Sequence, residues 1–171
     1  MSSFKELNKP LTRQGWERLA EEHRHLLEFE RPAMVQNMAT AAAEGDRSEN
    51  AEYIYSRKRM REIDKRLRYL TGLLKDAEII DPCNIRSDRV DFGASFVIED
   101  EAGHTKEWTI VGMGEAEAEK GTISWKSPLA LAVFGRKIGD FLTLERPAGA
   151  IDYTIVDIHY AGRRIEKLPK P

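Results

Sequence analysis

Apolar residues recur three and four positions apart between residues 60 and 77, which is the spacing of a coiled-coil helix. The series consists of Met60, Ile63, Leu67, Leu70, Leu74 and Ala77. Such a helix carries one apolar stripe, and a second helix must cover that stripe to remove it from water. The pattern therefore predicts a partner helix elsewhere in the chain.

The partner helix is predicted between Leu11 and Ala43, with Thr12 as its N-cap. Its apolar positions are Trp16, Leu19, His23, Leu26, Ala33 and Met38. Pro32 lies inside this stretch, and we expect a kink near Glu28 because proline removes a backbone hydrogen bond and crowds the preceding turn. The two helices are separated by a short joint and should form an antiparallel hairpin.

The periodicity changes after Asp81-Pro82. Strand-like segments follow, which read VDFGASFVIED, KEWTIVGM, GTISW, DFLTLERP and IDYTIVDIHY. One short helix is predicted among them, opened by Ser127 and Pro128 and closed by Gly135. The sequence thus predicts an α+β chain with a coiled-coil hairpin at 1–80 (tip at 44–53), a linker at 81–89, an antiparallel β domain at 90–161 and a flexible tail at 162–171.

Composition narrows the class of protein. Charged residues make up 33% of the chain, and the first residues contain no apolar run, so we expect a cytoplasmic protein without a membrane span. The single cysteine, Cys83, excludes an intramolecular disulfide and a cysteine-based zinc site, and we interpret it as incidental or structural.

An acidic stretch, EGDRSENAEY at 44–53, falls at the predicted joint. One interpretation is structural: Asp46 as N-cap and Glu49 at the third helical position would form a capping box. Another is chemical, because two carboxylates could complete the coordination of a magnesium ion held in another protein's active site. The pattern alone leaves both open.

The second helix is strongly basic. Seven cations lie between Arg57 and Arg68, against only Glu62 and Asp64. Four of them are spaced three, four and three apart and should share the face opposite the seam: Lys58, Arg61, Lys65 and Arg68. A stripe of this kind can be a solvated surface, but next to an acidic tip it favours contact with phosphates.

These segments together resemble the Gre transcript-cleavage factors of bacterial RNA polymerase. GDRSENAEY matches the family's tip pattern, and RKRMREIDKRLRYL looks more like the GreB branch than the GreA branch. The resemblance continues through VDFGASF, WTIVGMGEAE, ISWKSPLALAVFGRKIGD and IDYTIVDIHY, and covers roughly residues 10 to 160.

The resemblance implies a C-terminal domain similar to the FK506-binding-protein fold that docks at the rim of the polymerase secondary channel through Ser127 and Pro128. It implies that the protein is a monomer that binds no cofactor stably on its own. Its coiled coil would enter the channel and stimulate cleavage of backtracked RNA near the 3′ end of the transcript. Asp46 and Glu49 would share a magnesium ion with the polymerase. Residues expected near the RNA, or shaping the tip, are Asn50, Tyr53, Arg57, Lys58, Arg61, Lys65 and Arg68.

Other functions fit the sequence less well. An enzyme complete in itself is disfavoured because the four histidines show no metal-ligand spacing and no catalytic arrangement stands out. A prolyl isomerase would rest on fold alone. A module that occupies the channel and modulates or inhibits polymerase without cleavage is the principal alternative, and Asp46 and Glu49 argue against it. Lys126 departs from the family, in which the residue before Ser-Pro is often Asp or Asn.

Overall fold

The structure is a computed structural model, and it describes residues 8–43, 50–145, 147–161 and 163–164. The chain divides into two compact units. One unit comprises Trp16–Asp76, and the other comprises Met1–Gly15 together with Ala77–Pro171.

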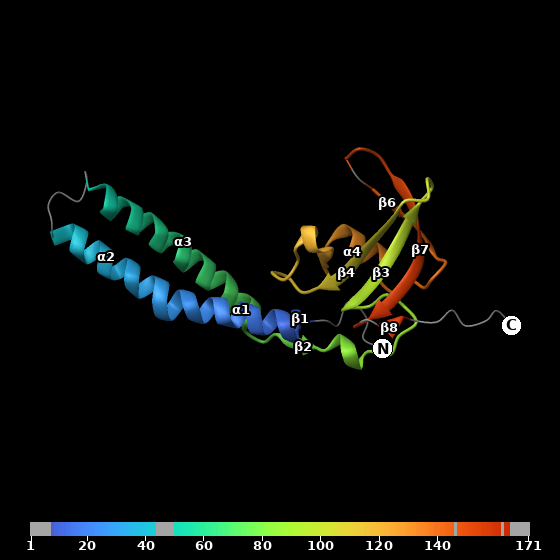
Figure 1. The fold of residues 1–171 in the computed structure, drawn as a ribbon, viewed down its shortest axis with the longest axis horizontal. Coiled ribbons are helices and arrows are strands. Elements are labelled where there is room, and N and C mark those ends of the chain that lie inside the picture. The colour runs from blue at the N-terminus through green and yellow to red at the C-terminus, as the bar shows by residue number, and fades with distance from the viewer. Residues whose placement is uncertain (1–7, 44–49, 146, 162, 165–171) are drawn as a thin grey trace. The chain divides into compact units, whose positions relative to one another are not determined.

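The unit at Trp16–Asp76 is the predicted antiparallel hairpin (Figure 1). Its first arm runs through α1 (Arg13–His25), the π-helical turn η2 (Leu26–Glu30) and α2 (Arg31–Ala43), and its second arm is α3 (Ala51–Leu74). The buried side chains between the arms include Leu19, Leu26, Ala41, Ser56, Ile63, Leu67 and Leu70. The predicted seam of α3 is confirmed from Ile63 to Leu70, whereas Ala77 lies beyond the end of the helix.

The first arm continues through Pro32, as predicted, and departs from α geometry in the turn just before it. The backbone N–H of Arg31 donates to the carbonyl of Leu26, five residues back, which defines the π turn. A π turn inserts one extra residue and so shifts the seam by one position. Ala33, predicted to lie in the seam, is therefore exposed, and Met34 is half-buried in its place.

The other unit contains a six-stranded sheet in the order β5-β4-β3-β7-β6, with β8 paired to β7. The strands are β3 (Ala94–Asp100), β4 (Thr105–Val111), β5 (Thr122–Ser124), β6 (Phe141–Leu144), β7 (Ile151–Tyr160) and β8 (Arg163–Arg164). All five predicted strand segments are confirmed. The sheet is mixed rather than purely antiparallel, because β4 and β5 run parallel. The polypeptide between them includes the short helical turn η4 (Ala118–Lys120), so the two strands are not joined by a simple hairpin turn.

One face of this sheet carries the core of the unit. Phe96, Ile110 and Ile158 are fully buried there, and Ala130 and Val133 of α4 (Pro128–Val133) pack against the same cluster. Alternation of buried and more exposed residues along β3 places Ser95, Val97 and Glu99 on the opposite face. The period-2 pattern of the sequence thus fixes which side of the sheet α4 covers.

The hairpin boundary predicted at residue 80 differs from the structure. Strand β1 (Pro10–Thr12) pairs in parallel with β2 (Glu78–Ile80), and both belong to the unit that contains the sheet. A short helical turn, η3 (Pro82–Asn84), follows β2. Thr12 caps α1 as predicted, because its hydroxyl accepts from the backbone N–H of Gly15.

Glu115, which belongs to the same unit as Thr12, stabilises this cap. Its buried carboxylate accepts the backbone N–H of Thr12 at 2.8 Å and the Thr12 hydroxyl at 2.7 Å. Burying a carboxylate is unfavourable unless donors of this kind replace its hydration. The arrangement leaves no room for a side chain at position 15, where an added Cβ would collide with Glu115.

Candidate nucleic-acid interface

The N-terminus of α3 is held by Asn50. Its side-chain oxygen accepts the backbone N–H groups of Glu52 at 3.1 Å and Tyr53 at 3.2 Å, so Asn50 is the N-cap. The predicted capping box of Asp46 and Glu49 is therefore wrong for this helix, since α3 begins at Ala51. Asp46 and Glu49 themselves fall within 44–49, outside the described residues.

Asn50 also reaches the other arm of the hairpin. Its Nδ2 donates to the carbonyl oxygen of Ala41 at 3.0 Å, within the last turn of α2. The final four carbonyls of a helix have no partner inside that helix. One side chain thus caps the beginning of α3 and the end of α2. Tyr53 lies in the first turn of α3 and is half-buried.

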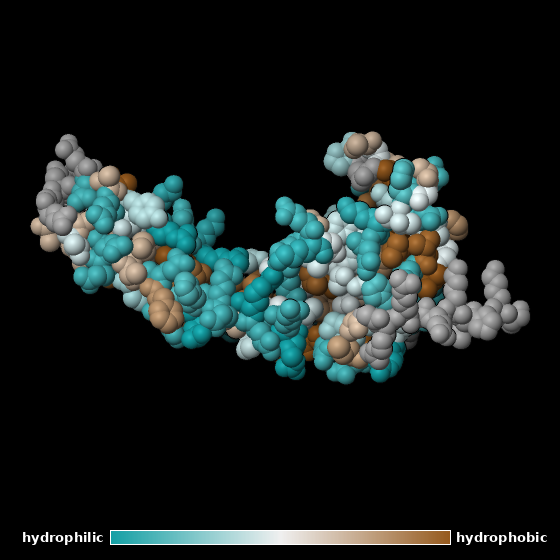
Figure 2. All heavy atoms as spheres, viewed as in Figure 1, coloured by the Kyte–Doolittle hydropathy of each residue, from teal (hydrophilic) through white to brown (hydrophobic). Residues whose placement is uncertain are grey.

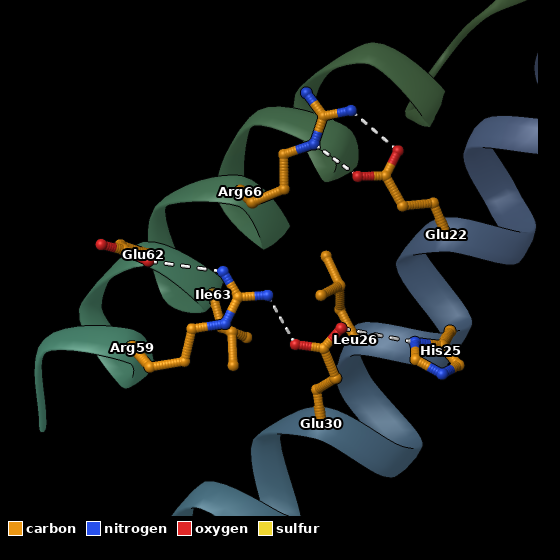
Figure 3. A pocket seen from close by; sticks show the side chains of 8 residues that line it. All are labelled: Glu22, His25, Leu26, Glu30, Arg59, Glu62, Ile63 and Arg66. Atoms are coloured by element: carbon orange, nitrogen blue, oxygen red, sulfur yellow. Dashed lines mark hydrogen bonds and ion pairs between the residues drawn. The ribbon is translucent and has the colours of Figure 1, made fainter. Parts of the chain in front are cut away.

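The seven cations of α3 divide into two groups, and the first group holds the hairpin together. Figure 3 shows Arg59 and Arg66 reaching from α3 toward acidic side chains of the facing arm. Arg59 contacts Glu30 at 2.7 Å and Glu62 at 3.3 Å. Arg66 donates two hydrogen bonds to Glu22, at 2.6 and 2.7 Å. Charge-assisted pairs with two parallel bonds are among the stronger surface interactions.

These pairs line a pocket of about 360 Å³ beside the π turn, whose apolar lining is Leu26 and Ile63. Hydrogen bonding to Arg66 lowers the pKa of Glu22, and the same bond raises the pKa of Arg66. The pKa of Arg59 is raised chiefly by its bond to Glu30. Arg66 and Glu22 therefore stay ionised near neutral pH, and the pocket is lined by charged side chains that already have partners.

The second group faces solvent. It consists of the exposed side chains of Arg57, Lys58, Arg61, Lys65 and Arg68, named here the basic row. At about 100° per residue these positions fall within an arc of about 100° on α3, on the side away from the seam. Hydrophilic side chains dominate the visible face of the hairpin (Figure 2).

The basic row is not neutralised by its own helix. Asp64 pairs with Arg31 at 2.9 Å and Glu62 pairs with Arg59, so both nearby acids are engaged elsewhere. Within the part of the chain that the structure describes, no side chain of the basic row makes an ion pair. A one-sign surface of this kind attracts a polyanion.

Ser127 and Pro128 lie at the start of α4, as predicted. The Ser127 hydroxyl accepts the backbone N–H of Ala130 at 3.2 Å, and Pro128 occupies the first helical turn. Pro128 is exposed, as is Leu131 one turn later. Lys126, the predicted departure from the family, places its Nζ 5.0 Å from the centre of the Trp125 ring.

The described residues contain no cluster of three or more histidine, cysteine or acidic side chains able to hold a metal ion. The described helices also include none with the length and apolar character needed to cross a membrane. The geometry defines a helical hairpin with an acidic tip sequence and a basic row, joined in one chain to a mixed-sheet domain.

Comparison with known protein families identifies the class of protein that has this arrangement. The family model "Transcription elongation factor, N-terminal" matches residues 9–79, and "Transcription elongation factor, GreA/GreB, C-term" matches residues 85–160. The chain belongs to the GreA/GreB family of transcription elongation factors. The resemblance found in the sequence is confirmed.

Individual relatives agree with the family. The chain is 44% identical over 150 residues to transcription elongation factor GreB of Pasteurella multocida, covering 88% of this chain and 95% of that one. It is 42% identical to GreB of Yersinia pestis, covering 88% of each. It is 39% identical over 152 residues to transcription elongation factor GreA of Thermodesulfovibrio yellowstonii, covering 88% and 96%.

Proposed function

We propose that this elongation factor inserts its hairpin into the secondary channel of bacterial RNA polymerase and stimulates endonucleolytic cleavage of backtracked RNA, which rescues arrested complexes. The observation that carries the proposal is the division of the α3 cations. Arg59 and Arg66 are used to hold the hairpin, whereas the basic row beginning at Arg57 remains exposed. That row starts within two turns of the acidic tip sequence.

The cap geometry supports a chemical role for the tip acids. Because Asn50 caps α3, the cap of that helix does not require a carboxylate at position 46 or 49. Asp46 and Glu49 offer oxygen ligands, the type that magnesium prefers. We propose that they bind, jointly with the polymerase, the second magnesium of its active site and orient a water molecule toward the scissile phosphate. The ion, when bound, stabilises the charge that develops on the phosphate oxygens.

The remaining site residues have supporting roles in this proposal. Asn50 and Tyr53 shape the tip by fixing the first turn of α3 against α2. The basic row binds phosphates of the extruded RNA strand and so brings its 3′ end toward the acids. Ser127 and Pro128, at the start of α4, dock on the rim of the channel.

The test uses cognate RNA polymerase stalled with a labelled, backtracked transcript. Magnesium and the protein are added, and RNA length is followed over time. Wild-type protein should shorten the transcript, and Asp46→Asn should bind polymerase without shortening it. Glu28→Gln is the matched control, since it removes an exposed carboxylate far along the chain from the tip, and it should behave as wild type.

Two results would contradict the proposal. If wild type binds polymerase but leaves the transcript intact, the protein is a channel-occupying module that acts without cleavage. If Asp46→Asn cleaves as well as wild type, the carboxylate of Asp46 is not the donated ligand.

A further inference from the structure

Tyr69 is an exposed aromatic residue on α3 next to the basic row. It follows Lys65 by four positions and Arg68 by one, so its side chain neighbours that of Lys65 along the helix surface. The residue is 42% exposed, so part of its ring faces solvent. Phe29 and Tyr55 of the hairpin are also exposed, but Tyr69 is the one that lies beside Lys65 of the basic row and in contact with Arg66.

Tyr69 is held in place from one side by Arg66. The guanidinium carbon of Arg66 lies 5.3 Å from the centre of the Tyr69 ring, within the range of a cation–π contact. Arg66 is itself fixed by its two hydrogen bonds to Glu22 on α1. The series of contacts from Glu22 through Arg66 to Tyr69 therefore orders an aromatic ring before any ligand arrives.

An ordered aromatic ring beside exposed cations is the arrangement by which proteins bind single-stranded nucleic acid without reading its sequence. Cations follow the phosphates, and the rings stack on bases. Arginine stacked on the same ring adds to the platform. A protein partner would not need five exposed cations next to the ring, whereas a polyanion with unpaired bases uses both features.

We propose that Tyr69 stacks on a base of single-stranded RNA whose phosphates lie along the basic row. This inference rests on the proposed function, because the RNA would be the extruded strand of a backtracked complex. Tyr69 thereby binds substrate at a point more than four helical turns from the start of α3 and adds affinity that does not depend on sequence.

The test measures binding of the full chain to two labelled strands at low ionic strength by fluorescence anisotropy. One strand is an RNA oligomer, and the other has the same length and ribose-phosphate backbone but no bases. Tyr69→Leu should weaken binding of the RNA by about fivefold or more and leave the abasic strand unchanged. Tyr69→Phe retains the ring and should bind as wild type.

Two further variants separate stacking from charge and from general aromatic exposure. Lys65→Gln should weaken binding of both strands, because phosphates are common to both. Phe29→Leu removes a ring that is 58% exposed on η2, outside the basic row, and should change neither. Circular dichroism and melting of each variant establish that the fold is kept.

The inference is overturned if Tyr69→Leu weakens both strands equally, if it changes neither, or if the wild-type chain binds no RNA. The transcript assay tests the proposed function independently of RNA binding by the free protein. Base-dependent binding through Tyr69 without transcript shortening by wild type would keep the stacking site and reject cleavage. Transcript shortening by wild type, with no effect of Tyr69→Leu on RNA binding, would support cleavage and reject the stacking site.

Discussion

The side chain of Asn50 joins the two arms of the hairpin by donating from Nδ2 to the carbonyl oxygen of Ala41, 3.0 Å away. The oxygen of the same amide accepts two backbone N–H groups at the start of α3. The amide supplies its donor and its acceptor on two separate atoms, whereas a carboxylate could accept at the cap but could not donate to Ala41.

Replacing Asn50 separates these two contributions. Asn50→Ala removes both and should lower the free energy of unfolding of the hairpin by about 1–3 kcal/mol. Asn50→Asp keeps the cap but removes the donor to Ala41, so its loss should be smaller than that of Asn50→Ala. Thermal unfolding followed by helical circular dichroism measures both. Equal destabilisation by the two variants would show that the cap to α3 contributes little.

Two glycines in helices should respond oppositely to alanine. Gly72 of α3 has open space around the position of a Cβ, so Gly72→Ala should stabilise the protein by about 0.5–1 kcal/mol through helix propensity. Gly15 of α1 is closely approached by Glu115, so Gly15→Ala should destabilise it despite the same gain in propensity. Denaturant unfolding of the two variants gives the signs. Stabilisation by Gly15→Ala would mean that Glu115 can move aside at little cost.

The Glu22–Arg66 pair predicts a pH dependence of stability. Because the pKa of Glu22 is lowered in the folded protein, the pair contributes stability above the ordinary pKa of 4.5, and that contribution is lost as pH falls through the lower, native pKa. Glu22→Gln should therefore cost up to about 1 kcal/mol at neutral pH, and less in acid. Melting temperatures of both proteins should converge as the pH is lowered from neutral to below the ordinary carboxyl pKa. A constant gap across that range would contradict an ionic contribution.

Arg59 and Arg61 should differ although they are neighbours on α3. Arg61→Gln removes a cation of the basic row and should reduce the slope of log affinity against log salt for RNA by about 1, with little effect on melting. Arg59→Gln breaks contacts to Glu30 and Glu62, so it should lower stability by up to about 1 kcal/mol and leave the slope nearly unchanged. If both variants reduce the slope equally, Arg59 exchanges its acids for RNA phosphates.

The sequence by itself determined the helical hairpin, strands β3 to β7 and the helix at Ser127, but not β1, β2 or β8, the last of which lies in the stretch predicted as a flexible tail. These features follow from local periodicity: a seam every three or four residues in one half and alternation in the other, each bounded by proline, glycine or a capping residue. The family followed from the same stretches, since the tip pattern and the basic helix are contiguous. Pro32 even marked where the first arm would depart from α geometry.

Only the tertiary structure decided which of several similar side chains performs each task. Asn50 rather than Asp46 caps α3, because the end of α2 presents the carbonyl of Ala41 to it. Arg59 and Arg66 hold the hairpin while the basic row stays exposed, because acids on the facing arm lie opposite those two arginines. The parallel pairing of β4 with β5 is also a long-range outcome. A periodic sequence says which face a residue occupies, but not which distant group will meet it there.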